Sequence, residues 1–124
     1  MGSGLQDNYS LKWQNFHQSL ASTFKDLRTD DEFLDVTIAC DVDQQIQAHK
    51  VIISACSPYF KSMLQKQRGA ANPVLIMPDS VRFQEVISIL DFMYQGEVTI
   101  PSEDYNSFMG AGKVCGESNT CSVI

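Results

Sequence analysis

The sequence has no long hydrophobic run. No stretch approaches the roughly 18 consecutive apolar residues of a membrane span, and the opening MGSGLQDNYS lacks the basic and apolar regions of a secretory signal. We therefore expect no membrane insertion and a reducing, intracellular compartment. Residues 1–8 are interpreted as a tag or a disordered N-terminus and are left out of the fold argument.

Basic residues are scarce as well. Nine Lys and Arg stand against fifteen Asp and Glu, which gives a formal net charge of −6. The basic residues are also scattered along the chain rather than clustered. Because a surface that binds duplex DNA needs Lys and Arg to neutralise phosphates, this segment is not expected to bind nucleic acid directly.

The motifs of metal, cofactor and catalytic sites are missing. The four cysteines form no CxxC pair, and neither His17 nor His49 lies at zinc-finger spacing from a cysteine pair. There is no P-loop, no dinucleotide-binding glycine pattern, no zinc-protease helix motif and no nucleophile elbow. We therefore predict no metal, no cofactor and no enzymatic activity.

One run, QAHKVIISACSPYF over residues 47–60, does contain residue types of nucleophilic catalysis. His49 and Cys56 are seven residues apart and would share a face of one continuous helix. However, His49 lies at a predicted strand-to-helix junction, and the apolar neighbours of Cys56 disfavour a reactive thiolate. We expect an inert, buried Cys56 and a His49 that is hydrogen-bonded to the backbone.

The last four residues, CSVI, have the form of a prenylation motif. Ser122 occupies a position where the motif has an aliphatic residue, and no polybasic stretch precedes it. A single lipid would also anchor the chain only weakly. The motif is therefore not expected to be modified, and the tail from residue 110 to 124, which has no periodicity, is predicted to be irregular.

Elsewhere the hydrophobic pattern predicts short strands and amphipathic helices. Ser57 and Pro58 are expected to start a second short helix. Ser80 is expected to cap the longest apolar helix, and Gly96 to end it. The predicted elements are a strand over 9–13, a helix over 13–27, a hairpin over 33–49, two helices over 50–65, a strand over 73–79, a helix over 80–96, a strand over 97–100 and a helix from 101. This order predicts a mixed α/β (α+β) domain over residues 9–109.

The helix over 13–27 has a wide aromatic and aliphatic stripe. Its apolar positions recur at steps of three and four residues: Trp13, Phe16, Leu20, Phe24 and Leu27. The stripe could pack on the core of its own domain or on a second copy of the chain. The strand over 9–13, in which Tyr9 and Leu11 alternate with polar residues, has no hairpin partner nearby in sequence and needs a distant sheet or another chain.

Several segments resemble one family in combination and order. DVTIAC, AHKVIISACSPYFKSML, PVLIMPD and FQEVISILDFMYQGEVTI are similar to the BTB/POZ domain over most of the chain. The leading YSLKW and the helix WQNFHQSLASTF resemble the Tramtrack-type group of this family, which is found in insect transcription and chromatin factors. The resemblance implies a short central sheet flanked by helices, with the N-terminal strand exchanged between the two chains of a dimer.

The resemblance also implies a set of interface residues. The helix interface would contain Trp13, Phe16, Leu20 and Phe24, and the exchanged strand would carry Tyr9 and Leu11. That strand would pair with residues 97–100 of the partner, which include Val98 and Ile100. Asp35 and Lys50 match an acid and a base of a charged pocket at the family's dimer interface. The partner of Asp35 would then be Lys50, and such a pair adds more to specificity than to stability.

Function follows from the resemblance as an expectation. The chain would be the homodimerisation module of a nuclear transcriptional or chromatin regulator, binding itself and related BTB domains, with co-regulator proteins as further partners. The Tramtrack-type group is also known to associate beyond the dimer. The alternative is a substrate adaptor that binds a cullin-type ubiquitin ligase scaffold, which stoichiometric binding to a cullin in a pull-down would favour.

Overall fold

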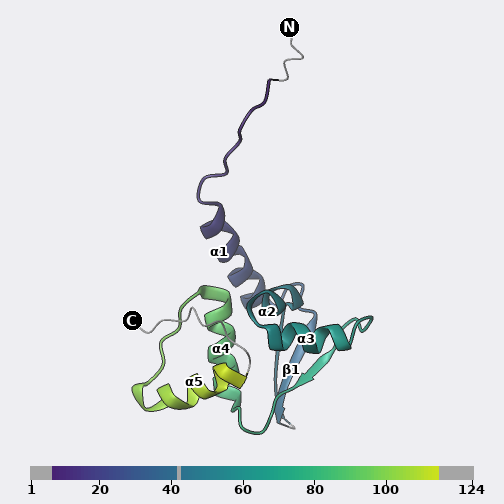
Figure 1. Cartoon of the computed structure of the whole chain (residues 1–124), viewed down its shortest axis with the longest axis vertical. Coiled ribbons are helices and arrows are strands. Elements are labelled where there is room, and N and C mark those ends of the chain that lie inside the picture. The colour runs from purple at the N-terminus through teal and green to yellow at the C-terminus, as the bar shows by residue number, and fades with distance from the viewer. Residues whose placement is uncertain (1–6, 42, 115–124) are drawn as a thin grey trace.

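The structure is a computed structural model of the chain, and it describes residues 7–41 and 43–114. Its helices and strands are interleaved along the sequence (Figure 1). The strands are β1 (Val36–Asp41), β2 (Gln44–Ala48) and β3 (Val74–Ile76). The helices are α1 (Phe16–Thr29), α2 (Lys50–Cys56), α3 (Pro58–Lys66), α4 (Phe83–Gln95), the 3₁₀ turn η1 (Ser102–Asp104) and α5 (Tyr105–Val114). The predicted mixed α+β class is confirmed.

The three strands form one sheet in the order β2-β1-β3. The β-branched run of β1 pairs antiparallel with β2, with Ile38 opposite Ile46 and a register shift between Ala39 and Asp41. On its other side β1 pairs in parallel with β3, with Ile38 opposite Leu75. The predicted hairpin is therefore present, and the apolar run at residues 73–79 supplies the short third strand.

The core lies between one face of this sheet and the helices. Alternation along the strands turns Val36, Ile38 and Leu75 to that face. The fully buried side chains are Phe60, Ile38, Ile53, Leu75, Ile89, Leu90, Val36, Val86 and Ser57. They come from β1, β3, α2, α3, α4 and the α2–α3 corner, so these elements form a self-sufficient hydrophobic centre.

Of the three predictions made for helix ends, two are confirmed and one is wrong. The Ser57 hydroxyl accepts a hydrogen bond from the Phe60 backbone amide and caps α3, as predicted. Gly96 ends α4 with a φ of 80°, a backbone conformation that favours glycine. The prediction of Ser80 as the α4 cap was wrong: α4 starts at Phe83 after Arg82, and the Glu85 carboxylate accepts a hydrogen bond from the Arg82 amide.

Three predicted segments differ from the structure. Residues 9–13 and 97–100 are extended but form no strand. A strand exists only when its backbone groups pair with another strand, and no described part of a single chain pairs with either segment. The irregular tail was predicted to begin at residue 110, yet α5 continues to Val114 because Phe108 and Ala111 bury themselves in the core.

Candidate interaction surface and its internal supports

Helix α1 projects away from the rest of the molecule, and the leading segment, defined here as residues 7–15, continues in the same direction (Figure 1). No residue of α1 is buried. In the leading segment Leu11 is 93% exposed and Trp13 is 64% exposed. A helix with a strong apolar stripe is expected to bury it, so a large part of this stripe has no cover within the part of the chain that the structure describes.

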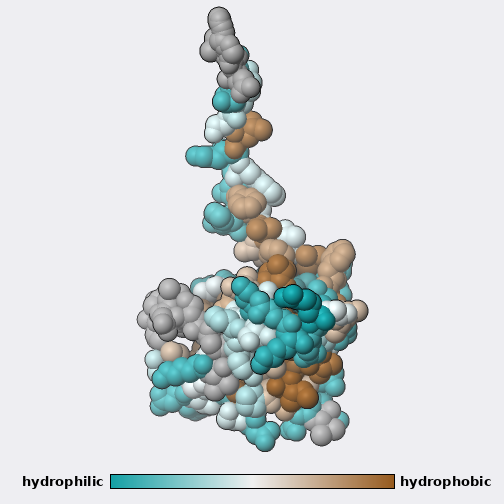
Figure 2. Space-filling view, turned by 45° about the vertical axis from the view of Figure 1, so that its right-hand side comes forward, coloured by the Kyte–Doolittle hydropathy of each residue, from teal (hydrophilic) through white to brown (hydrophobic). Residues whose placement is uncertain are grey.

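The exposed side chains on this projection are those that the sequence indicated. Trp13 and Phe16 make an edge-to-face ring contact, with centroids 4.9 Å apart. Phe16 and Leu20 are each 39% exposed, and Tyr9 is largely exposed. In Figure 2 hydrophobic side chains gather along the projection and around its base. We call these five residues (Tyr9, Leu11, Trp13, Phe16 and Leu20) the α1 surface.

The C-terminal end of α1 is attached to the core. Phe24 is half-buried and packs against the core cluster. Arg28 donates a hydrogen bond to Asp91 of α4 at 2.8 Å, and its guanidinium lies 4.9 Å from the centre of the Tyr94 ring. Phe24 thus belongs mainly to the attachment of α1, whereas the predicted residues before it remain exposed.

A buried hydrogen-bond network lies beneath this attachment. The Nε2 of His49 is 2.8 Å from the Glu32 carbonyl, which can only accept, so Nε2 carries the proton. The Nδ1 then accepts from the Tyr94 hydroxyl at 2.7 Å, and the same hydroxyl accepts from the His49 backbone amide at 2.9 Å. Burial raises the pKa of Tyr94, so the phenol stays protonated and able to donate.

This network argues against a catalytic role for His49. Both ring nitrogens are occupied by structural partners, and the backbone bond that the sequence predicted is the one to Glu32. The Sγ of Cys56 is half-buried and lies 3.9 Å from the Met93 carbonyl oxygen. His49 therefore connects the α1–β1 loop and the start of α2 to α4 through hydrogen bonds, and it does not act as a general base for Cys56.

Asp35 and Lys50 lie close together, but their contact is not between the two charged groups. The Asp35 carboxylate accepts a hydrogen bond from the Lys50 backbone amide at 2.7 Å, at the start of α2. The Lys50 ammonium donates instead to the Ala70 carbonyl at 3.1 Å. The partner of the strand-end carboxylate is thus an orphan amide of a helix N-terminus, which is a favourable place for a negative charge.

Val98 and Ile100, predicted to lie in the pairing strand, are half-buried and pack against the core cluster. Between them Thr99 is exposed. The segment 97–100 is therefore held against the domain by alternate side chains and is already extended. The structure does not bring it together with residues 9–13 of the same chain, because the leading segment continues beyond the outer end of α1, away from the rest of the molecule (Figure 1).

The sequence reasoning missed a second polar joint, between α4 and α5. The buried Glu85 carboxylate accepts hydrogen bonds from the Arg82 amide at 2.9 Å and from the Ser107 hydroxyl. Burial raises the pKa of Glu85, but these hydrogen bonds outweigh it, so the pKa lies below its ordinary value. Neither Arg82 nor Ser107 carries a local sequence signal for this contact, because Arg is not a capping residue type and Ser107 lies 22 positions from Glu85.

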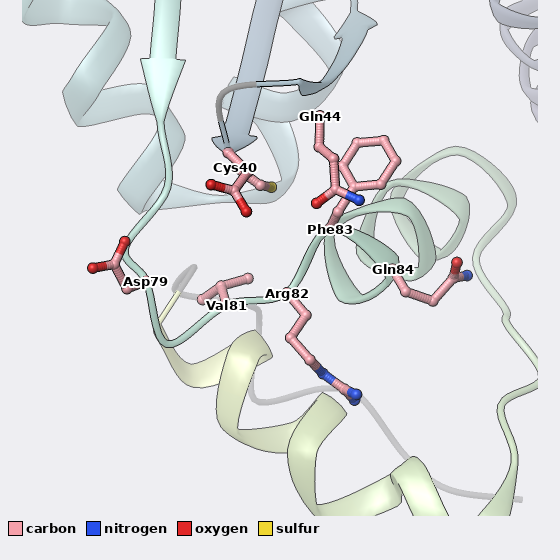
Figure 3. Close-up of a pocket in the computed structure, with 8 residues that line it drawn as sticks. Cys40, Gln44, Asp79, Val81, Arg82, Phe83 and Gln84 are labelled. Atoms are coloured by element: carbon pink, nitrogen blue, oxygen red, sulfur yellow. The ribbon is translucent and has the colours of Figure 1, made fainter.

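A surface pocket of about 580 Å³ lies between the end of the β1–β2 hairpin and the start of α4 (Figure 3). Cys40 and Gln44 line it from the strand ends, and the Arg82 side chain points away from them toward α5. Burial, and then the nearby Asp41 carboxylate, raise the pKa of the Cys40 thiol. This thiol is therefore kept in its unreactive protonated form, and the pocket lacks the parts of a catalytic site.

Other functional classes find no support in the part of the chain that the structure describes. Residues 7–41 and 43–114 contain no group of three or more His, Cys, Asp or Glu side chains placed to hold a metal ion. None of the helices there has the length and apolar character of a membrane span. The CSVI motif lies outside the described residues.

Comparison with known proteins gives consistent results. The BTB/POZ domain family model matches residues 24–115. Protein abrupt of Drosophila melanogaster is 44% identical over 84% of this chain, which spans 11% of that protein. Longitudinals lacking protein-like, also of Drosophila melanogaster, is 39% identical over 94% of this chain and 91% of its own length.

A solved structure agrees with the fold. The BTB domain of zebrafish PATZ1 superimposes with a TM-score of 0.72, covering 87% of this chain and 86% of that chain, at 22% sequence identity. The Drosophila relatives agree with the Tramtrack-type resemblance noted from YSLKW and the helix after it. The chain spans only a small part of the length of some of these relatives.

Proposed function

Because this chain belongs to the BTB/POZ domain family, a family of protein–protein interaction modules, we propose that it is the self-association domain of a nuclear transcriptional or chromatin regulator. The observation that carries this proposal is the α1 surface. Contiguous exposed apolar side chains on a soluble domain mark a place where another protein binds. Leu11 and Trp13 are strongly exposed, and the leading segment that carries them projects away from the core (Figure 1).

A second copy of the chain is the partner that fits this surface. Two copies related by a two-fold axis would bury the same apolar side chains of α1 against each other. The apolar stripe of this helix consists of Trp13, Phe16, Leu20, Phe24 and Leu27 and contains no charged residue. Two chains of net charge −6 can therefore approach each other along the stripe without direct repulsion between its side chains. Burial of each large apolar side chain would contribute about 1.5–3 kcal/mol before the entropic cost of association.

The leading segment supplies the second half of the interface. Tyr9, Leu11 and Trp13 alternate with polar residues, as in a half-buried strand, but they do not belong to the sheet that the described residues form. The segment 97–100 is extended, with Val98 and Ile100 turned to the core. Pairing of residues 9–13 with 97–100 of the partner would give both segments the backbone hydrogen bonds that each lacks alone.

The contacts at the base of α1 preorganise this surface for a partner. Arg28 ties the end of α1 to Asp91 and Tyr94, and Tyr94 is held in turn by His49. The projection is thus fixed at one end by side chains that do not belong to the interface. A preorganised surface loses less conformational entropy on binding than a flexible one.

Self-association would act through avidity. Joining two chains that each carry a DNA-binding region elsewhere raises their effective concentration at clustered sites. The proposal therefore includes nuclear location, binding to related BTB domains and to co-regulator proteins, and no catalysis by this segment. The acidic composition agrees with a role that leaves nucleic-acid contact to other parts of such a regulator.

Light scattering on a sizing column, over a dilution series, tests the proposal. Leu11→Asp places a charge on the apolar side of the leading segment and should shift the mass toward one chain. Ser10→Asp places the same charge on the other side of the segment and should leave the mass unchanged. Equal masses for the two variants, or a wild-type protein that elutes as one chain throughout, would contradict the proposal.

A further inference from the structure

Charge is distributed unevenly along the chain. The basic residues are scattered, but the acidic ones are not: residues 44–78 contain Lys50, Lys61, Lys66 and Arg68 and no Asp or Glu. The other residues hold all fifteen acidic residues and five basic ones, which is a formal charge of −10. Residues 44–78 therefore form a positive segment, with a formal charge of +4, in an otherwise acidic chain.

Helix α3 presents most of this positive charge to solvent. Its inner side is apolar, with Phe60 buried in the core. Its exposed positions are Pro58, Lys61, Ser62, Gln65 and Lys66, and Arg68 is exposed in the turn that follows the helix. We call Lys61, Lys66 and Arg68 the α3 patch. The outer side of α3 thus carries basic and neutral side chains and no carboxylate.

The α3 patch lies on the body of the molecule, whereas the α1 surface lies on the projection. Helix α3 and the loop after it are on the right-hand side in Figure 1. Figure 2 brings this side forward and shows strongly hydrophilic side chains gathered on it. A partner bound at the α3 patch would therefore leave the α1 surface free.

The charges of the α3 patch have no counter-ions among the described residues. The ion pairs of that part of the chain are all made by Arg28 and Arg82. The Lys50 ammonium donates to the Ala70 carbonyl at 3.1 Å, in the loop after α3, and so adds a fourth positive charge near the end of the patch. Like charges held together repel each other, and a negatively charged partner would turn this repulsion into attraction.

We propose that the α3 patch binds a short acidic segment of a different protein, with Asp or Glu at alternate positions. Lys61 and Lys66 are five positions apart, or about 7.5 Å along the helix axis. Alternate residues of an extended peptide point to the same side and lie about 6.6 Å apart. Two carboxylates of the peptide would then face these two ammonium groups, and a third would reach Arg68, whose guanidinium can donate two hydrogen bonds to it.

The charge of the rest of the chain restricts the partner to a short anion. Duplex DNA carries one negative charge per about 1.7 Å and extends far beyond three basic side chains. Its further phosphates would approach residues whose formal charge is −10. A peptide of about five extended residues spans only about 17 Å, so its charges end where the patch ends. The observations therefore favour an acidic peptide over nucleic acid.

Fluorescence anisotropy of a labelled peptide of alternating Glu and Ser residues tests the proposal, with a peptide of alternating Lys and Ser as its opposite. The wild-type protein should bind the acidic peptide more tightly than the basic one. Lys61→Glu should weaken binding of the acidic peptide about tenfold, because a repulsion replaces an attraction. Lys113→Glu changes the net charge by the same amount at an exposed position of α5 and should bind like the wild type.

The Lys61→Glu substitution is chosen to leave the fold intact. Lys61 is exposed and is the fourth residue of α3, near the helix N-terminus, where a negative charge is favourable. Far-UV circular dichroism should be the same for the wild type and both variants. Raising the salt from 0.1 M to 1 M shortens the Debye length from about 10 Å to about 3 Å, and should weaken binding of the acidic peptide to the wild type.

Amide chemical shifts locate the bound peptide. The largest changes on adding the acidic peptide should fall within residues 58–70. Equal affinities of Lys61→Glu and Lys113→Glu for the acidic peptide, equal binding of the two peptides by the wild type, or largest shift changes outside this range would each overturn the proposal.

Three further results would also overturn it. Duplex DNA that displaces the acidic peptide from the wild type would make the patch a nucleic-acid contact. A lower mass of Lys61→Glu than of the wild type in light scattering, without peptide, would make the patch a contact with a second copy. Leu20→Asp, which should break the α1 contact, should bind the peptide as the wild type does. Loss of binding in this variant would contradict a site held by one chain, whereas loss of α1 association alone would leave the site standing.

Discussion

Phe16 in α1 and Phe60 in α3 are the same residue type in two helices of one chain, yet Phe16 is 39% exposed and Phe60 is 1% exposed. Phe60 packs in a centre built by the sheet and helices α2 to α4. Phe16 lies on a helix with no buried residue. The difference indicates that Phe60 and its buried neighbours stabilise the single chain, whereas the apolar side chains of the outer part of α1 contribute little to its stability and are accessible to another molecule.

The largest effect on the free energy of unfolding should come from truncating the buried member of this pair of phenylalanines. Phe60→Ala opens a cavity in the core and should lower the free energy of unfolding by about 3–5 kcal/mol. Phe16→Ala should change the stability of the isolated chain by less than about 0.5 kcal/mol while it weakens association. Chemical denaturation at several protein concentrations separates the two effects, because only association makes stability depend on concentration. A large loss at high dilution in Phe16→Ala would show that α1 belongs to the core.

The joint between the two regions should give the next largest effect. Tyr94→Phe removes the hydroxyl that accepts from the His49 amide and donates to its Nδ1. Leaving these buried groups without a partner should lower the free energy of unfolding by about 1–3 kcal/mol. Tyr105→Phe, at a 40% exposed position, is the matched control and should have almost no effect. Equal thermal midpoints for both variants would rule out a stabilising role for the His49–Tyr94 contact.

The hydrogen-bonded Glu85 carboxylate between α4 and α5 predicts that the stability of the domain depends on pH. The folded pKa of Glu85 lies below its ordinary value, so its contribution to stability is fully present above the unfolded pKa of about 4.3. That contribution is lost as the pH falls through the lower folded value. Glu85→Gln should therefore be less stable than the wild type at neutral pH and approach it in acid. A difference that stays constant, or grows, as the pH falls would contradict the assignment.

The smallest effect is expected at the ion pair that fixes α1. Asp91 is partly exposed, so the solvent screens its pair with Arg28. Asp91→Asn should cost at most about 1 kcal/mol of stability, with exchange of the amides of α1 becoming faster than exchange in α4. Hydrogen exchange measured helix by helix would detect this, and equal changes in both helices would show that the pair does not act on α1 in particular.

Sequence reasoning succeeded where the signals are local. The hairpin, the Ser57–Pro58 corner and the Gly96 end of α4 depend on residues a few positions apart. It failed for α5 beyond residue 110, where two glycines lower helix propensity but Ala111 is buried against the core. Tertiary packing outweighed the local preference there.

The contacts that support the candidate site could not be read from the sequence. Arg28 and Asp91 are 63 positions apart, and His49 and Tyr94 are 45 positions apart, with no motif that links either pair. Asp35 and Lys50 were expected to form an ion pair, but the Asp35 carboxylate accepts a hydrogen bond from the Lys50 backbone amide at the start of α2 instead. Which residues of the apolar stripe are exposed also depends on the direction in which α1 leaves the core, and periodicity gives only the face of the helix.

Sedimentation velocity over a wide dilution series, with Leu20→Asp and Ser22→Asp beside the wild type, tests the central claim most directly. Leu20 lies on the α1 surface, and Ser22 lies about 200° around the same helix. The wild type and Ser22→Asp should share a mass of at least two chains, and Leu20→Asp should fall toward a lower mass at the same concentrations. A Leu20→Asp protein with the wild-type mass would contradict the claim that α1 binds a second copy of the chain.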